Sequence, residues 1–179
     1  TVGKMLAKKH GYLFVSVTEL LRDEAKRRDQ PVEREVLRTI SAEWRRESRL
    51  GVLVDKAVAE YEKLKDKYVG VVMASLRNPG EADRIHELGG VLVWVDADPR
   101  VRYERVLANA TSRGRVAEDT KTFEQFLAEE EAEMHKPAEG DDANLNMAGV
   151  KAKADISIQN DSADLAQFEQ DVERALGLG

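Results

Sequence analysis

Arginine side chains recur where a hydrophobic segment of the sequence gives way to a polar one. Arg22 follows "YLFVSV", Arg77 follows "YVGVVMA" and Arg105 follows "VLVWVDA". A guanidinium group presents a planar fork of N–H donors that matches the oxygens of phosphate. We therefore expect these arginines to bind a phosphate-bearing ligand if the fold brings them together.

The segment "VSVTELLRDEAKRR" predicts one such position in detail. Thr18 is expected to cap a helix, with Glu19 in its first turn and Arg22 one turn further along the same face. A cationic fork beside a helix N-terminus can hold phosphate. The alternative is a capped surface helix with a Glu19–Arg22 ion pair. For Arg77, which precedes an Asn-Pro-Gly turn, the alternative is an exposed arginine without a ligand.

A second basic stretch is "VDADPRVRYERVLANATSRGR". It carries Arg100, Arg102 and Arg105 on an expected helix, and Arg113 and Arg115 in a glycine-containing loop. Loop arginines can close over a nucleotide and stabilise the charge that develops during phosphoryl transfer. The alternative is a basic helix that balances the acidic run "AEEEAE" at residues 128–133. That run itself is expected to form a solvated helix face.

Composition limits the function classes. The chain has 179 residues, a net charge of −6 and a pI of about 5.3, which fits a single domain over 1–179 and argues against non-specific binding to nucleic acid or anionic membranes. It contains no cysteine, so disulfides and thiolate chemistry are excluded. Its three histidines are far apart, and no metal-ligand set is predicted. With no long apolar run and no visible signal peptide, we expect a cytoplasmic protein.

Four short apolar runs predict the strands, at residues 12–17, 68–74, 91–97 and 154–160. The second and third are nearly continuous Val, Leu and Met, which predicts burial on both faces of a parallel sheet. Six helices are expected between and after them, at residues 18–28, 33–65, 79–88, 100–110, 120–134 and 164–176. This alternation predicts a layered α/β fold, whose ligands bind at the carboxyl ends of the strands.

The order of these segments resembles the P-loop nucleotide kinases. The nearest resemblance is to adenylate-kinase-like and dephospho-CoA-kinase-like members and to an archaeal group placed among them. The opening "TVGKMLAKKHG" is similar to the helix that follows the phosphate loop, with Thr1 as the last residue of that loop. The Gly3-Lys4 pair does not form such a loop in its own right. The resemblance implies a three-layer fold, with an acceptor-binding helical region at about 18–66 and a lid at about 109–119.

The resemblance also implies roles for individual residues. "VTELLR" resembles the acceptor-binding segment, so Arg22 would bind the acceptor phosphate and Glu19 would lie near the metal or the acceptor. Arg45 and Arg77 would also bind the acceptor. Arg105, Arg113 and Arg115 would be lid arginines that face the transferring phosphate. Asn160 and Thr1 would lie near ATP.

The departures from the family pattern matter as much. The phosphate loop with its lysine is not in this sequence, and Ala74 and Ser75 replace an Asp-Gly pair. In this family the first strand lies in the middle of the sheet, between the strands at 68–74 and 91–97. We expect a chain cut off before Thr1, poorly stable because buried strand edges lack partners. Its structure should show a slot in the sheet or a substitute strand.

The expected activity of the full-length protein is ATP- and Mg²⁺-dependent phosphate transfer to a nucleotide-like acceptor. A nucleoside or deoxynucleoside monophosphate is the first choice, and dephospho-CoA is the alternative. Another alternative is a non-catalytic nucleotide-binding protein on the same scaffold, and a third is a scaffold that binds no nucleotide. The 179-residue chain itself is expected to be inactive, and either a monomer or a homodimer.

Overall fold

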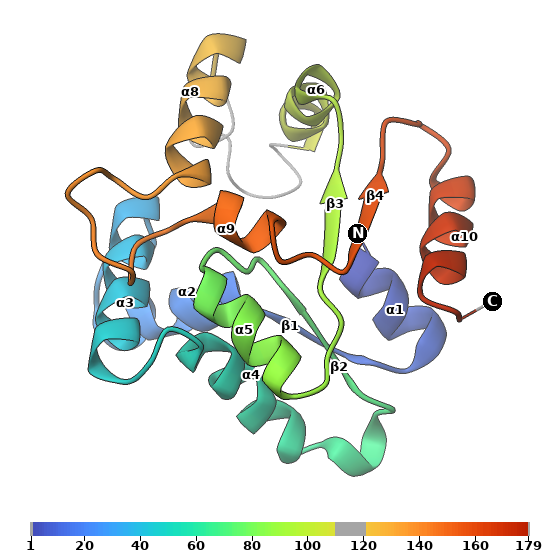
Figure 1. Cartoon of the computed structure of the whole chain (residues 1–179), viewed down its shortest axis with the longest axis horizontal. Coiled ribbons are helices and arrows are strands. Elements are labelled where there is room, and N and C mark those ends of the chain that lie inside the picture. The colour runs from blue at the N-terminus through green and yellow to red at the C-terminus, as the bar shows by residue number, and fades with distance from the viewer. Residues whose placement is uncertain (1, 110–120, 179) are drawn as a thin grey trace.

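The chain folds as the predicted α/β protein, in which helices flank short parallel strands (Figure 1). The computed structural model describes residues 2–109 and 121–178. The elements in chain order are α1 (Val2–His10), β1 (Leu13–Ser16), α2 (Val17–Arg27), α3 (Arg34–Glu47), α4 (Val52–Glu62), a 3-10 turn η1 (Lys65–Lys67), β2 (Val71–Ala74), α5 (Pro79–Glu87), β3 (Val93–Asp96), α6 (Pro99–Asn109), α8 (Phe123–Met134), α9 (Met147–Lys151), β4 (Ile156–Gln159) and α10 (Leu165–Ala175).

The strands form two separate parallel pairs. β1 pairs with β2, from Leu13 opposite Val71 onward, and β3 pairs with β4, from Val93 opposite Ile156 onward. No described strand joins β2 to β3. Residues of both strands instead line one open cavity of about 1390 Å³. The predicted slot in the sheet is therefore confirmed, at the expected place.

The slot explains one wrong prediction. The runs at 68–74 and 91–97 were expected to be buried on both faces, yet no residue of β2 or β3 is fully buried. Only Leu92 and Ala97, which flank β3, are buried in these runs. Val95 on β3 keeps 40% of its surface exposed. The hydrophobic sequence of these strands is that of a sheet interior, but their facing edges border the slot rather than another strand.

The helix boundaries differ from the expected ones in two main places. α2 begins at Val17, so Thr18 is not its cap, and Ser16 holds the cap position without a side-chain hydrogen bond. The expected helix at 33–65 is divided into α3 and α4. Gly51 lies at this break, where a Cβ atom would come within 2.6 Å of Arg84 Cβ. The last helix, α10, is capped by the side chain of Asp164, which accepts from the backbone N–H of Gln167.

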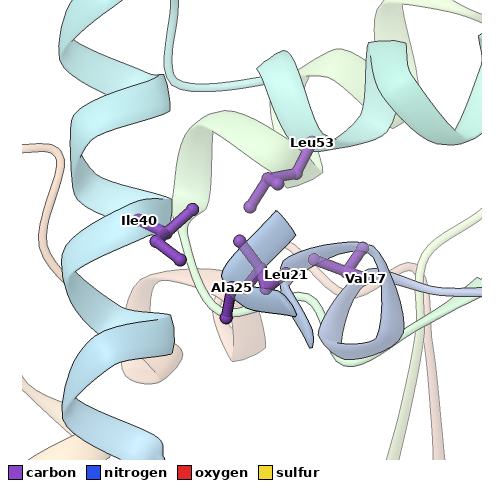
Figure 2. Packing of buried hydrophobic residues seen from close by; sticks show 5 residues of the cluster. All are labelled: Val17, Leu21, Ala25, Ile40 and Leu53. Carbon is purple, nitrogen blue, oxygen red and sulfur yellow. The ribbon is translucent and has the colours of Figure 1, made fainter. Parts of the chain in front are cut away.

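The main hydrophobic cluster joins α2, α3 and α4 (Figure 2). Its buried members are Val17, Leu21, Ala25, Ile40 and Leu53. Burying a side chain the size of leucine or isoleucine stabilises the fold by about 1.5–3 kcal/mol. This cluster therefore fixes the positions of three helices, of which α2 and α3 carry Glu19, Arg22 and Arg45 of the predicted acceptor-binding residues.

A second cluster packs α1 against α10 through Met5, Leu6, Phe168 and Val172. Gly3 of α1 lies against the ring of Phe14, where a Cβ atom would come within 2.5 Å of the ring. This glycine serves the close approach of a helix to a strand. The geometry agrees with the prediction that the Gly3-Lys4 pair is not a phosphate loop.

Candidate anion-binding site

A small pocket at the carboxyl ends of β1 and β2 gathers basic side chains from three parts of the chain. Five arginines line it: Arg22 from α2, Arg34, Arg38 and Arg45 from α3, and Arg77 from the turn after β2. We call this site the arginine pocket. Its volume is about 90 Å³, and Val17, Leu21 and Leu53 of the main cluster also line it. Since pockets for whole small molecules usually span about 300–1,000 Å³, this one suits a single group such as phosphate.

The structure brings together three residues that the sequence predicts for acceptor binding, namely Arg22, Arg45 and Arg77. What they bind remains a prediction. Sequence reasoning missed Arg34 and Arg38. A signal was available, because positions 34, 38, 41 and 45 follow the spacing of one helix face, and all four residues line the pocket.

Several donors of the arginine pocket lack acceptors. The buried Nε atoms of Arg22, Arg38 and Arg45 make no hydrogen bond. A buried donor without a partner costs free energy, so such groups in a native protein call for an explanation. An oxyanion in the pocket is the kind of partner that would supply acceptors to guanidinium groups.

Arg45 is the most deeply buried member and also supports the others. Its Nη2 donates to Glu81 Oε1 at 2.6 Å, and the side chains of both residues are almost fully buried. Its Nη1 donates to the carbonyl of Ala143 at 2.9 Å. The other oxygen of Glu81 accepts from the backbone N–H of Arg77 at 2.7 Å. Arg45 therefore holds, through Glu81, the backbone that carries Arg77.

The turn after β2 is fixed by its own hydrogen bonds. Asn78 Oδ1 accepts from Gly80 N at 2.9 Å and caps α5, as the Asn-Pro-Gly turn requires. Asn78 Nδ2 donates to the carbonyls of Asp142 and Asn144. At the start of the turn, Ser75 has a φ of 71°, a left-handed conformation that glycine adopts more easily. Ser75, which the resemblance aligns with a glycine, lines both the arginine pocket and the slot.

The acidic run on α8 is not the solvated face that the sequence predicts. Glu129 binds Arg34 at 2.9 Å, and Glu130 binds Arg102 through both of its oxygens. Glu133 reaches the arginine pocket, where its side chain is only 13% exposed. These three carboxylates form ion pairs with arginines that are distant in sequence. The pattern of a single helix cannot reveal such partners.

The remaining predicted residues lie elsewhere. Arg105 donates to the backbone carbonyls of Asn160 at 2.6 Å and Ser162 at 2.7 Å, beside the slot. The two predicted residues Arg105 and Asn160 therefore meet, but away from the arginine pocket. Glu19 lies 3.5 Å from Arg22 as an ion pair and is mostly exposed. Thr1, Arg113 and Arg115 lie outside the described residues.

The carboxyl end of β3 carries a balanced ionic cluster. Asp96 accepts from Arg102 Nη1 at 2.6 Å and from Lys151 Nζ at 2.8 Å. Partial burial by itself raises the pKa of Asp96. Hydrogen bonds from Lys151, from the Trp94 ring and from the Ala97 backbone outweigh that effect, so the pKa lies below its usual value. We call Asp96, Arg102, Arg105 and their partners the β3 end.

The resemblance implies a bound magnesium ion, so clusters of acidic side chains in the described ranges 2–109 and 121–178 bear on it. No group of three or more His, Asp or Glu side chains there could hold a metal ion. Asp96, the acid at the end of β3, is already engaged by two cations. Within the same ranges, no helix has the length and apolar character needed to cross a membrane.

Comparisons with known proteins agree with part of the expected resemblance. A UPF0200 protein of Pyrococcus abyssi is 29% identical over 170 residues, covering 93% of this chain and 83% of the relative. A UPF0200 protein of Pyrobaculum aerophilum is 29% identical over 180 residues, covering 98% and 88%. A third, from Thermococcus sibiricus, is 26% identical over 170 residues, covering 93% and 82%. No protein-family model matches the chain. The chain is thus similar to archaeal proteins whose name states no activity.

Proposed function

We propose that this protein is an ATP-dependent phosphotransferase. Its acceptor is a nucleotide-like molecule, most simply a nucleoside or deoxynucleoside monophosphate. One observation carries the proposal: five arginines from separate segments line a pocket of about 90 Å³ at the carboxyl ends of two parallel strands. Phosphoryl transfer depends mainly on positioning and on charge neutralisation, and arginines supply both.

In this proposal the arginine pocket binds the phosphate of the acceptor. Arg22 on α2 and Arg77 in the turn after β2 provide N–H donors to the phosphate. Arg34 and Arg38 on α3 add positive charge. Arg45 acts mainly as a positioning residue, because its Nη atoms are committed to protein acceptors. A bound phosphate would thereby be held in one orientation, with its free oxygens directed to the donor nucleotide.

The P-loop assignment draws support from the slot. The unpaired edges of β2 and β3 border one cavity of about 1390 Å³, which leaves room for a parallel strand between them. A strand at that position would end at the same edge of the sheet as the arginine pocket, where a phosphate loop is needed. ATP would supply the transferable phosphate and Mg²⁺ would offset its charge, but the described residues provide the acceptor half of such a site only.

Two other functions remain alternatives. Ala74 and Ser75 stand where the family has Asp-Gly, and this loss of a carboxylate favours a nucleotide-binding protein without catalysis. Dephospho-CoA as acceptor would receive phosphate on a sugar hydroxyl. The number of arginines around a space of phosphate size favours a monophosphate acceptor instead.

The test has a binding arm and a turnover arm. Calorimetry would measure the affinity of the 179-residue chain for AMP, dCMP and dephospho-CoA. Arg22→Gln should weaken monophosphate binding at least about tenfold, since hydrogen bonds to charged groups contribute roughly 1.5–3 kcal/mol. Arg174→Gln removes an equal charge from an exposed site and should change nothing.

The turnover arm uses the whole reading frame that encodes this chain. ATP consumption that depends on a monophosphate would support the kinase. Tight ATP binding without transfer would favour the non-catalytic alternative. Equal monophosphate binding by wild type and both variants would contradict the proposed pocket.

A further inference from the structure

Glu133 occupies an unusual position for an acidic residue. It lies at the C-terminal end of α8, and its carboxylate meets three guanidinium groups of the arginine pocket. Glu133 Oε1 lies 3.4 Å from Arg34 Nη1 and 3.3 Å from Arg38 Nη2, and Glu133 Oε2 accepts a short hydrogen bond from Arg77 Nη1. Among the described residues that line the pocket, Glu133 is the sole acid beside five arginines.

This geometry makes Glu133 a substitute for a ligand oxyanion. A carboxylate and a phosphate present similar oxygens to a guanidinium fork, so both compete for the same donors. Arg34 and Arg38 also pair with Glu129 and Glu35, but together with Arg77 they converge on the one carboxylate of Glu133. The buried Nε atoms of Arg38 and Arg45 make no hydrogen bond. A phosphate dianion would bring more charge and more acceptor oxygens than Glu133 does.

The attachment of α8 permits such an exchange. Near its N-terminal end, Phe123 and Phe126 pack on the ring of Tyr103 of α6, with ring centres 5.4 and 5.6 Å apart. No residue of α8 is fully buried. Toward its C-terminal end the helix is held by ion pairs, and the chain then runs toward α3 (Figure 1). Ion pairs exchange partners more readily than a packed apolar face.

We infer that Glu133 is a built-in competitor, which closes the arginine pocket with the end of α8 until an acceptor phosphate displaces it. On binding, Arg77, Arg34 and Arg38 would turn from the carboxylate to the phosphate, and the end of α8 would be released. The inference rests on the proposed function, because it assumes a phosphate ligand. It adds that ligand binding and the position of α8 are coupled.

The first test compares two charge-removing variants of α8. Glu133→Gln keeps the shape of the side chain and removes its charge, and Glu131→Gln does the same at an exposed position two residues away. If Glu133 holds the pocket closed for nine-tenths of the time, E133Q should bind AMP and inorganic phosphate about tenfold more tightly than wild type. E131Q should bind them like wild type. Calorimetry gives the affinities, and circular dichroism checks folding.

A second test measures the position of α8 in a protein that retains Glu133, so that it does not depend on the folding of E133Q. The chain has no cysteine, so Thr39→Cys on α3 and Ala132→Cys on α8 allow two spin labels to be attached specifically. Adding AMP should shift the distance distribution between the labels. The same shift should occur without AMP when E133Q is added to this background.

The outcomes separate the inference from the proposed function. Equal affinities of wild type and E133Q, or an unchanged label distance while AMP binds, overturn the inference and leave the pocket's function standing. Failure of AMP and inorganic phosphate to bind to wild type and to E133Q overturns both. If E133Q but not E131Q binds AMP more tightly than wild type, and the label distance shifts, the result supports both the inference and the proposed function.

Discussion

Two groups of arginines lie at the carboxyl ends of strands, and they use their hydrogen-bond donors differently. At the β3 end, Arg102 binds both oxygens of Glu130 and one of Asp96, and Arg105 binds two backbone carbonyls. In the arginine pocket, by contrast, Arg34, Arg38 and Arg77 all reach one carboxylate, that of Glu133. The buried Nε atoms of Arg38 and Arg45 make no hydrogen bond, although Arg34, Arg38 and Arg45 also pair with Glu129, Glu35 and Glu81.

The difference separates arginines that hold the fold together from arginines available to a ligand. Both groups come from similar sequence patterns, a hydrophobic run followed by basic residues. Their arrangement in three dimensions distinguishes them, because three pocket arginines converge on one carboxylate beside an open space, while Arg102 spans two carboxylates. Arg105 lies at the β3 end and not in the arginine pocket, so its role toward a bound anion stays a prediction.

The largest expected effect comes from the buried support of the pocket. Arg45→Met leaves the carboxylate of Glu81, which is 0% exposed, without its cationic partner. Removing one member of a buried ion pair costs about 3–5 kcal/mol, so the free energy of unfolding should fall by that amount. Urea denaturation measures it. Arg105→Met is the matched control and should cost less, since Arg105 donates only to backbone carbonyls beside the surface. A loss below that of the control would show that Arg45 does not support the pocket.

The next prediction compares one arginine substitution in each of the two regions. Arg77→Gln should weaken AMP binding at least about tenfold, because a charged donor in the pocket is lost. Its effect on stability should be smaller than that of Arg102, which is about equally exposed, since the Arg77 guanidinium pairs with the carboxylate of Glu133 while Arg102 pairs with two carboxylates. Arg102→Gln should do the reverse: affinity stays the same, while stability falls by about 1–2 kcal/mol with the loss of charged hydrogen bonds. Calorimetry and urea denaturation on both variants give the comparison, and similar profiles for the two would remove the distinction.

The sequence predicts the skeleton of this fold well, for a physical reason. Each of the four strands lies inside a predicted apolar run, because a strand between helices must bury its side chains whatever surrounds it. The gap between β2 and β3 was also expected, although from the resemblance and not from periodicity. The division of the helix at 33–65 was missed, since the break at Gly51 depends on the close approach of α5, which is distant in sequence.

The site was predictable in part. Arg22 and Arg77 stand out because they follow strands, and strand ends meet at one edge of a sheet. Glu133 could not be found this way, because an acidic run on an amphipathic helix usually faces water. Its three arginine partners come from α3 and from the turn after β2, and only the folded chain brings them to α8.

A pH experiment sharpens the view of the β3 end as structural. Partial burial raises the pKa of Asp96. The hydrogen bonds that Asp96 accepts from Lys151 and its other donors lower the pKa by a larger amount, so the folded-state pKa lies below the unfolded value of 3.8. The stability that this carboxylate contributes is therefore present above about pH 4 and is lost as the pH falls through the folded pKa. Asp96→Asn should flatten the decline in the free energy of unfolding between about pH 5 and pH 2.

Lys151→Met provides the control for that experiment, since it removes the cation while the carboxylate stays. It should raise the pKa of Asp96 toward its usual value and flatten the same decline. Urea denaturation at a series of pH values measures both variants. An unchanged slope in D96N would mean that the β3 end does not depend on this charge.

The smallest expected effect concerns Ser75, which lines both the pocket and the slot. Its φ of 71° is strained for a residue with a Cβ atom, and glycine relieves that strain while making the unfolded chain more flexible. Ser75→Gly should therefore raise the free energy of unfolding by about 0.5–1 kcal/mol. AMP affinity should not change, because the pocket's donors are arginines. Loss of stability would show that the Ser75 hydroxyl or Cβ makes a contribution larger than the strain, and the turn would then be part of the site rather than only its support.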